Sequence, residues 1–257
     1  MLSPSLFNVY VNDLSVSLNK LDIGCLYNGI IINNFLYADD SCVLAPSPAG
    51  LQKLLNVCSQ YAIEHTIIYN PKKTVCICFR GAKLSNLKIP RIYLDGTLLQ
   101  FVDSTRYLGI ILTDNLNDNK DISRHVKYIY FKGNLITRKF ANCSVDVKRK
   151  LFTTFCYAIY GGPLWSNFNN SSFTKAKVAF NNVYRHLFNF RRGLSVSHSM
   201  VLNGIDCFNV LIRKHHYSFR TRLHKSSNSY VQSVIHSFYF MYESRLSHIW
   251  KKDLFRL

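Results

Sequence analysis

Apolar and polar residues recur with the period of an α-helix over much of the second half of the chain. Between residues 122 and 140, apolar positions fall on one arc of a helix at about 100° per residue, and basic positions fall on the opposite arc. The apolar arc consists of Ile122, Val126, Ile129, Tyr130, Ile136 and Phe140. The basic arc consists of Arg124, Lys127, Lys132, Arg138 and Lys139. This pattern predicts an amphipathic helix with a basic outer face, in which Gly133 is unfavourable.

The same spacing predicts further helices. The first covers residues 147–160 and should end at Gly161-Gly162-Pro163. The others are expected at about 173–190, at 206–224 and at 229–251. Their apolar stripes are Leu151, Phe155 and Ile159 in the first, Phe180, Val183, Tyr184 and Leu187 in the second, and Val231, Ile235, Phe238, Tyr242, Leu246 and Ile249 in the last.

The chain begins with a different helix signal. Ser3 and Pro4 are typical of a helix start, and Leu6, Tyr10 and Leu14 form one apolar stripe. We therefore expect a buried helix there.

Between this helix and residue 112, short apolar runs are separated by turn residues. They predict strands on both sides of Ala38-Asp39-Asp40, a strand at 75–79 and a hairpin across Asp95-Gly96. The segments 45–49, 112–121 and 167–172 are expected to be the least regular.

Charge is unevenly distributed along the chain. Residues 1–71 contain two basic and five acidic residues, whereas residues 72–257 contain thirty basic and nine acidic residues. The net charge of +18 therefore belongs to the later part, and a polyanionic partner is its simplest explanation. A solubilising surface is the alternative. The later basic clusters Arg191-Arg192, Arg213-Lys214 and Arg220 with Arg222 are candidate contacts to RNA.

Eight cysteines raise the question of disulfides or zinc. No Cys-x-x-Cys pair is present, and Cys42, Cys58 and Cys156 lie inside apolar runs, where cysteine acts as a small hydrophobic residue. The adjacent His215 and His216 should point in different directions on a helix, which argues against joint metal binding. No stretch has the pattern of a signal peptide or a membrane span, and together with free thiols this predicts a reducing intracellular location.

The candidate chemistry lies at Asp39 and Asp40, which follow one short apolar strand and precede another. Carboxylate oxygens suit Mg²⁺, and phosphoryl-transfer enzymes use such ions to activate one oxygen and neutralise another. Two aspartates in a turn are, however, more often a solvated turn than a metal site. The segments around the pair decide between these interpretations.

Four short patterns occur in a fixed order: Leu2-Ser3-Pro4-Ser5-Leu6-Phe7, Tyr37-Ala38-Asp39-Asp40, Asn70-Pro71-Lys72-Lys73-Thr74 and Tyr107-Leu108-Gly109. In this order and context, the chain resembles the C-terminal part of the reverse transcriptase domain of non-LTR (LINE-type) retrotransposons. The resemblance implies an α+β fold with a partial polymerase palm at 1–112, a helical thumb-like region at 113–192 and a C-terminal helical region at 193–257. It also implies an RNA template, a DNA primer, deoxynucleotides and two Mg²⁺ as partners of the intact enzyme, in cytoplasm and nucleus.

The resemblance assigns roles residue by residue. Asp39 would be the metal-binding aspartate and Asp40 its weaker neighbour, with Tyr37 at the nucleotide-binding end of the strand. Lys73 would protonate the departing pyrophosphate. Lys72 is its rival, since only one of the two lysines can face the site if the backbone is already extended there. The alternative for both is a solvated loop lysine.

Further along the chain, the resemblance concerns nucleic-acid contacts. Tyr107, Leu108 and Gly109 would hold the primer terminus, with Gly109 allowing close approach of the backbone; an ordinary strand end is the alternative. The basic arc of residues 122–140 would contact the template–primer duplex, and a plain solvated helix face is the alternative there.

A polymerase of this kind also needs an aspartate from an earlier palm strand and a fingers subdomain. Asp13 and Asp22 are the only acids before Asp39, and neither lies in the expected strand context. We therefore expect a polymerase fragment that is inactive alone. Two alternatives are a non-catalytic basic module that binds nucleic acid and a relic without a cellular role.

Overall fold

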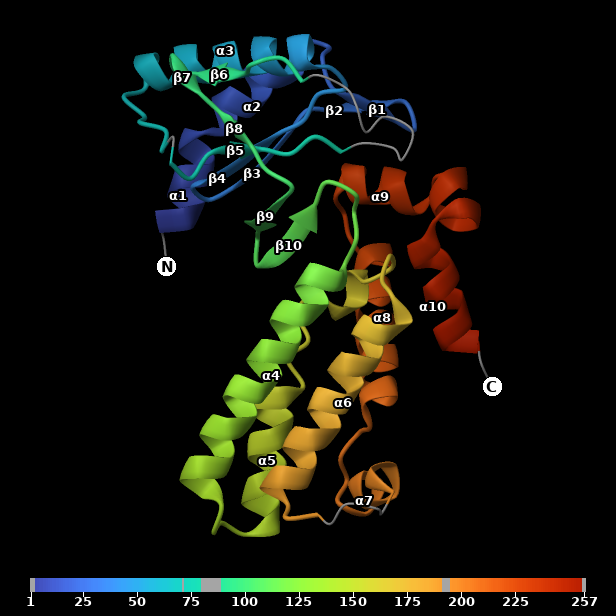
Figure 1. Ribbon diagram of the computed structural model, residues 1–257. Coiled ribbons are helices and arrows are strands. Elements are labelled where there is room, and N and C mark those ends of the chain that lie inside the picture. The colour runs from blue at the N-terminus through green and yellow to red at the C-terminus, as the bar shows by residue number, and fades with distance from the viewer. Residues whose placement is uncertain (1–2, 71, 80–88, 191–194, 256–257) are drawn as a thin grey trace. The chain divides into compact units, whose positions relative to one another are not determined.

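The computed structural model describes residues 3–70, 72–79, 89–190 and 195–255 (Figure 1). Leu2 of the first motif, Pro71 of the third and the basic pair Arg191 and Arg192 lie outside the described residues. The chain forms two compact units, Met1–Asp103 and Ser104–Leu257. Helices together with small, mostly antiparallel sheets confirm the predicted α+β class.

The first unit begins with two short helices instead of one buried helix. Helix α1 (Ser3–Tyr10) is followed by a turn at Val11 and by α2 (Asn12–Asn19). The side chains of Leu6 and Tyr10 are 61% and 47% exposed, whereas Leu14 is 3% exposed. The prediction of one buried stripe was therefore wrong, because the helix is interrupted at Val11 and the buried core begins with Leu14.

Helix α3 (Pro48–Glu64) occupies a stretch whose beginning was expected to be irregular. The Ser47 hydroxyl accepts a hydrogen bond from the backbone N–H of Gly50 at 3.1 Å, and Pro48 takes the first helical position. Leu54, Cys58 and other residues of α3 pack against α2 and later strands. The buried core of this unit consists of Leu14, Leu18, Leu54, Leu55, Cys58, Tyr61, Cys76, Ile92, Leu94 and Leu99.

The strands of the first unit are short. They are β1 (Cys25–Tyr27), β2 (Ile30–Ile32), β3 (Asn34–Tyr37), β4 (Asp40–Val43), β5 (Val75–Cys76), β6 (Tyr93–Leu94), β7 (Thr97–Leu98) and β8 (Gln100–Phe101). Three antiparallel pairs form among the described strands, β1 with β2, β3 with β4 and β6 with β7, and β5 pairs with β8 in parallel. In the part of the chain that the structure describes, each of these sheets has two strands, so their outer edges are unpaired.

Two of these hairpins have turns that the sequence specifies directly. Asp95 and Gly96 connect β6 to β7 with φ angles of +49° and +69°, which confirms the predicted hairpin. Asn28 and Gly29 connect β1 to β2 with φ angles of +49° and +79°. Left-handed backbone at both turn residues is the geometry that Asn-Gly and Asp-Gly pairs favour between antiparallel strands.

The second unit starts with a hairpin and continues as helices (Figure 1). The hairpin consists of β9 (Ser104–Tyr107) and β10 (Ile110–Thr113). The helical elements are α4 (Asn119–Phe140), α5 (Val145–Cys156), the 3-10 turn η2 (Gly162–Leu164), α6 (Asn170–Leu187), α7 (Val196–Leu202), α8 (Phe208–His224), α9 (Ser229–Ile235), the π-helical turn η3 (Tyr239–Glu243) and α10 (Arg245–Phe255). Residues from α4 through α8 share one hydrophobic core, so the expected regions 113–192 and 193–257 are packed together.

Helix α4 runs without interruption through Gly133. A Cβ at this position would overlap the side chain of Val183 on α6. Glycine therefore lets α4 and α6 approach closely, and this packing outweighs its weak helix propensity. The predicted helix at 122–140 is confirmed, except that Tyr130 is 37% exposed and does not belong to the buried face.

Two other helix predictions were correct only in part. Helix α5 ends at Cys156, before Gly161, and its fully buried residues are Phe152 and Cys156. The stretch 229–251 is divided among α9, η3 and α10, which leaves Phe238 and Tyr242 69% and 58% exposed. The predicted stripe assumed one continuous helix, and the breaks after α9 and η3 remove its common face. None of the helices in the described residues is long and apolar enough to cross a membrane.

Candidate active site and nucleic-acid interface

The turn between β3 and β4 presents the two aspartates. Tyr37 pairs with Asp40 across the hairpin, so Ala38 and Asp39 form the two-residue connection. Ala38 has a φ angle of +50°, which is uncommon for a residue with a side chain. Its backbone N–H donates a hydrogen bond to Oδ1 of Asn8 on α1 at 3.0 Å. A contact from α1, the helix of the first motif, therefore helps to hold this turn in place.

Both carboxylates are exposed to solvent. Neither carboxylate has a hydrogen bond or an ion pair to another described residue, and Tyr37 beside them is 64% exposed. Their oxygens are hard donors that fit a divalent cation such as Mg²⁺. Within the described ranges, however, no group of three or more His, Cys, Asp or Glu side chains is placed to hold a metal. The turn thus offers part of a ligand set.

The two candidate lysines lie in a turn. The side-chain oxygen of Asn70 accepts a hydrogen bond from the backbone N–H of Lys72 at 3.1 Å, and its carbonyl oxygen accepts one from Lys73 at 3.1 Å. Thr74 donates to the same carbonyl through both its N–H and its hydroxyl. The strand β5 begins only at Val75, so the condition of an extended backbone at the lysines is not met. Alternation of strand faces therefore does not choose between Lys72 and Lys73.

Tyr107, Leu108 and Gly109 form the end of the β9–β10 hairpin. Tyr107 pairs with Ile110, and the turn residues Leu108 and Gly109 have φ angles of +44° and +83°. A Cβ on Gly109 would lie 3.1 Å from Cε1 of Tyr160. The segment is thus a tight hairpin tip, in which the left-handed backbone at residue 109 favours glycine and a side chain there would press against the ring of Tyr160.

Asp121 anchors this hairpin to α4. Its side chain is fully buried, and Oδ1 accepts a hydrogen bond from the backbone N–H of Ile111 on β10 at 3.1 Å. Arg124 pairs with the same oxygen at 2.7 Å, and Nε1 of Trp165 donates to Oδ2 at 2.9 Å. A buried carboxylate is stable only when its oxygens are hydrogen-bonded in this way. Asp121 therefore connects the hairpin, α4 and the segment that contains Trp165.

Two neighbouring residues complete this junction. A Cβ on Gly161 would overlap Oδ2 of Asp121, so the backbone can approach the carboxylate only because residue 161 is glycine. The carboxylate of Asp118 accepts hydrogen bonds from the backbone N–H groups of Ser166 and Asn167, each at 2.7 Å. Burial raises the pKa of Asp118, and these two hydrogen bonds oppose that rise.

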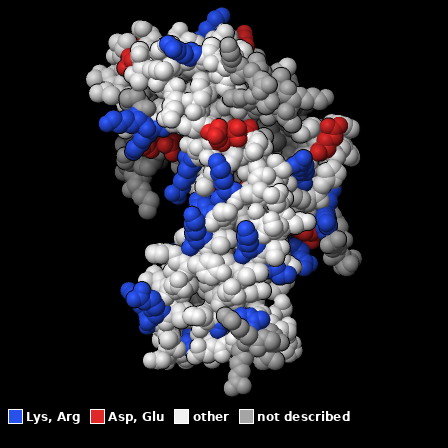
Figure 2. All heavy atoms as spheres, viewed as in Figure 1, with Lys and Arg blue, Asp and Glu red and all other residues white. Residues whose placement is uncertain are grey.

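The basic arc of α4 is not uniform. Arg124 is paired with Asp121, and Nζ of Lys132 lies 5.5 Å from the ring centre of Tyr128 and 5.6 Å from that of Phe155. Lys127, Arg138 and Lys139 are exposed and form no ion pair with a described residue. Figure 2 shows Lys and Arg side chains spread over the visible face of the second unit, with uncharged residues between them. Three of the five predicted side chains are therefore available to a phosphate backbone.

The sequence contained a signal for the pairing of Arg124. Asp121 precedes it by three residues, the spacing at which opposite charges meet on a helix. The contacts of Asp121 to Ile111 and Trp165, and of Tyr160 to Gly109, join segments far apart in the chain, so periodicity could not reveal them.

Similarity to known proteins covers the same motifs. Residues 1–112 match the family model for reverse transcriptase (RNA-dependent DNA polymerase). This segment is homologous to reverse transcriptases. All four sequence patterns lie within it, and it ends inside the β9–β10 hairpin, which belongs to the second compact unit.

Two curated proteins from insect mobile elements are similar to the chain. The RNA-directed DNA polymerase from the mobile element jockey of Drosophila melanogaster is 27% identical over 135 residues, which are 50% of this chain and 14% of that protein. The retrovirus-related Pol polyprotein from the type-1 retrotransposable element R1 of Bradysia coprophila is 25% identical over 210 residues, which are 73% of this chain and 20% of that protein. The chain thus spans a fifth or less of the length of these relatives.

Proposed function

We propose that the chain forms part of the palm and the thumb of a retrotransposon reverse transcriptase, toward the C-terminal end of its catalytic domain. The intact enzyme would join deoxynucleotides to a DNA primer along an RNA template. The observation that carries this proposal is the placement of Asp39 and Asp40 at an exposed hairpin turn inside the segment homologous to reverse transcriptases.

The residues of the turn suit a metal-dependent polymerase. Asp39 and Asp40 would supply oxygen ligands to Mg²⁺, which when bound would activate the attacking oxygen and neutralise the departing phosphates. Lys73, or Lys72 beside it, would donate a proton to the departing pyrophosphate. Tyr37 would line the nucleotide end of the strand, and the tip at Tyr107, Leu108 and Gly109 would contact the primer terminus.

We further propose that this ligand set is completed by sequence outside the 257 residues. Two-metal catalysis needs more carboxylate ligands than one turn provides, and the relatives are several times longer. The purified chain should therefore fail to extend a primer on an RNA template with Mg²⁺ or Mn²⁺. Template-dependent extension that disappears in Asp39→Ala would contradict this prediction and would show that the chain is complete as a catalyst.

The basic surface of α4 supports a second part of the proposal, binding of the template–primer duplex. Lys127, Arg138 and Lys139 can neutralise phosphates without breaking any contact to the described residues. Backbone neutralisation of this kind gives binding that weakens with salt, by roughly 0.9 in the log–log slope for each phosphate contact on duplex DNA.

The duplex test compares two variants of equal charge. Changing Lys127, Arg138 and Lys139 to Glu should weaken binding to an RNA–DNA duplex and lower the salt slope. Changing the exposed Lys150, Lys175 and Lys225 to Glu removes the same charge elsewhere and should have a smaller effect. If both variants lose duplex affinity equally, the residues of α4 contribute only through the net charge of the chain. Duplex binding by a chain that never supports synthesis, even with a complementing polymerase segment, would favour a non-catalytic binding module.

A further inference from the structure

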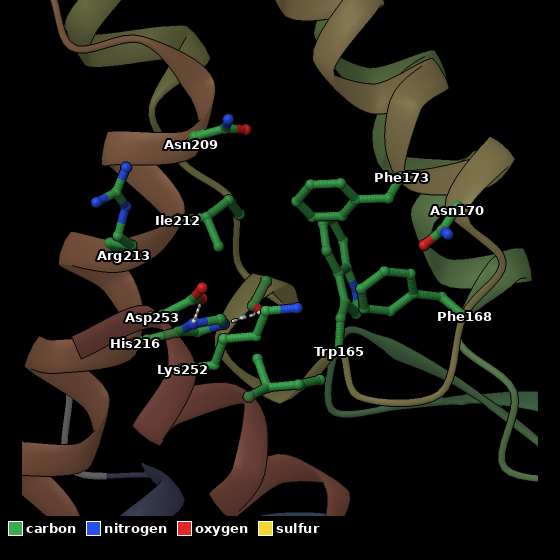
Figure 3. Close-up of a pocket in the computed structure, with 12 residues that line it drawn as sticks. Trp165, Phe168, Asn170, Phe173, Asn209, Ile212, Arg213, His216, Lys252 and Asp253 are labelled. Atoms are coloured by element: carbon green, nitrogen blue, oxygen red, sulfur yellow. Dashed lines mark hydrogen bonds and ion pairs between the residues drawn. The ribbon is translucent and has the colours of Figure 1, made fainter. Parts of the chain in front are cut away.

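A cavity of about 340 Å³ lies in the second unit, between the segment 162–173, helix α8 and helix α10 (Figure 3). Its inner surface is apolar and includes Trp165 and Ile212. This volume is within the range of pockets that hold small ligands. Arg213, a candidate RNA contact in the sequence, lines this cavity, whereas none of the described lining residues was assigned above to metal, primer or duplex contacts.

One wall of the cavity is aromatic. The rings of Phe168 and Phe173 are stacked, with their centres 5.2 Å apart and their planes at 17°. Phe173 is held in turn by an edge contact to Phe208, 5.4 Å away in the core. Both rings remain partly exposed, and Figure 3 shows them on the same side of the cavity as Trp165. A flat, supported and partly exposed aromatic surface is suited to stacking against another planar ring.

The opposite side carries positive charge. Arg213 from α8 and Lys252 from α10 line the cavity, and neither side chain forms a hydrogen bond or ion pair with a described residue. Figure 3 shows the amino end of Lys252 directed toward the aromatic side. The exposed side-chain amide of Asn170, at the first residue of α6, adds hydrogen-bonding capacity where the helix dipole is positive.

Among the described lining residues, the one carboxylate, that of Asp253, is already paired. Oδ2 of Asp253 lies 2.8 Å from Nδ1 of His216, whose Nε2 is 3.3 Å from the carbonyl oxygen of Gly162. Each nitrogen of this buried ring therefore lies beside an oxygen of another residue. The pair joins α8 to α10, and among the described lining residues Arg213 and Lys252 are the charged side chains without an ion-pair partner. The cavity therefore favours an anion that also has a planar ring.

We propose that this cavity binds one nucleotide, with its base against the Phe168 and Phe173 wall and its phosphate at Lys252 and Arg213. The nucleotide is part of a single-stranded nucleic acid or is a free mononucleotide, since both have the same base and phosphate. This site is separate from the duplex surface of α4 and does not depend on polymerase activity.

The experiment measures binding of fluorescently labelled, short single strands to the full chain. The probes are oligothymidylate, the matching oligouridylate and an abasic strand of the same length, which keeps the phosphates but lacks the bases. The variant Phe168→Leu keeps an apolar side chain without a ring, and Phe238→Leu is its control at an exposed position outside the cavity. Phe168→Leu should weaken binding of the base-carrying strands by at least about fivefold and leave the abasic strand unaffected.

Lys252→Gln provides an independent test that does not depend on the core, because Lys252 is exposed. It should weaken the binding of all three probes and lower the slope of log affinity against log salt concentration by roughly 0.7, the value for one single-strand phosphate contact. Lys150→Gln should change neither quantity. Competition with AMP distinguishes a free mononucleotide from a nucleotide within a strand. If AMP displaces the labelled strand at concentrations similar to those at which the strand binds, the site is assigned to a free nucleotide. If AMP does not displace the strand, the site is assigned to single-stranded nucleic acid. Equal binding of the normal and abasic strands, or unchanged binding in both variants, would overturn the proposal. Loss of polymerase function in the intact element would not bear on these measurements.

Discussion

The two compact units differ in what they contribute to the protein. The first contains the aspartate turn and the lysine turn, but its strands are two to four residues long and its sheets have two strands each within the described ranges. The second contains a core in which Phe152, Phe180, Tyr184 and Phe208 are at most 1% exposed. The most recognisable sequence and the most self-sufficient packing therefore lie in different regions. Recognisable motifs mark where chemistry is expected, and they do not mark where stability resides.

The boundary between the units sharpens this comparison. The match to the reverse transcriptase family model ends at residue 112, whereas the compact units divide between Asp103 and Ser104. The hairpin β9–β10 thus belongs by sequence to the first region and by packing to the second, through the hydrogen bond from Ile111 to Asp121. Pieces of this chain prepared for experiments should therefore be divided between Asp103 and Ser104.

The largest expected difference is between the units expressed separately. Residues 104–257 should fold cooperatively, because their core is complete within that range. Residues 1–103 should be poorly soluble, since unpaired strand edges and exposed apolar side chains such as Phe35 and Leu26 promote aggregation. Size-exclusion chromatography and thermal unfolding of the two pieces measure this. A monodisperse, cooperatively melting preparation of residues 1–103 would refute the comparison.

A single core substitution in the second unit should have the next largest effect. Phe180 is fully buried, with its ring centre 5.0 Å from that of Phe152 and 5.7 Å from that of Phe208. Phe180→Ala should lower the free energy of unfolding by about 3–5 kcal/mol in residues 104–257. Val178→Ala on the same helix, where Val178 is 46% exposed, should change it by less than about 0.5 kcal/mol. Denaturant unfolding of both variants checks the difference.

Acid should destabilise the second unit through His125. Burial lowers the pKa of His125 to about 4 in the folded protein, below its ordinary value of 6.5, and the nearby Arg124 and His215 act in the same direction while Asp121 opposes them. Its Nε2 has no hydrogen-bond partner among the described residues. The unfolded chain therefore binds the proton more readily between these values, so stability is full above pH 6.5 and falls as the pH approaches 4.

The expected loss from His125 over this interval is about 2–3 kcal/mol. His125→Leu should flatten the pH dependence of unfolding between pH 6.5 and 4, whereas His198→Gln, at an exposed position, should leave it unchanged. Unfolding free energies of residues 104–257 measured across this interval provide the test. An unaltered slope in His125→Leu would assign the acid sensitivity to other groups.

Turn residues and helical periodicity predicted the elements whose structure depends mainly on neighbouring residues in the sequence. The hairpin at Asp95-Gly96 and the helix near residues 173–190, observed as α6 with all four stripe residues buried, were found from turn chemistry and periodicity. The same turn signal at Asn28-Gly29 was overlooked, although its backbone has the same left-handed geometry. The start of α3 was misjudged because its two prolines suggested an irregular joint, while Ser47 and Pro48 form a favourable helix start.

The remaining differences arise from packing between distant segments. The buried role of Asp121 depends on Trp165, which follows it by 44 residues. In the candidate site, the exposed position of Lys127, Arg138 and Lys139 followed from the helix pattern. The aromatic contacts of Lys132 required the position of Phe155 on α5, which lies outside that pattern.

Each unit contains a buried cysteine whose chemical labelling can report the opening of that unit. All eight thiols are free, and burial raises the pKa of Cys58 in the first unit to about 11 and that of Cys156 in the second to about 12. The thiolate is the form of cysteine that attacks an alkylating reagent, so these two side chains react only when the packing around them opens. The rate at which each cysteine is labelled therefore reports how often its own unit opens. Labelling rates of Cys58 and Cys156 in the intact chain would therefore measure the opening of the two units separately, without any substitution.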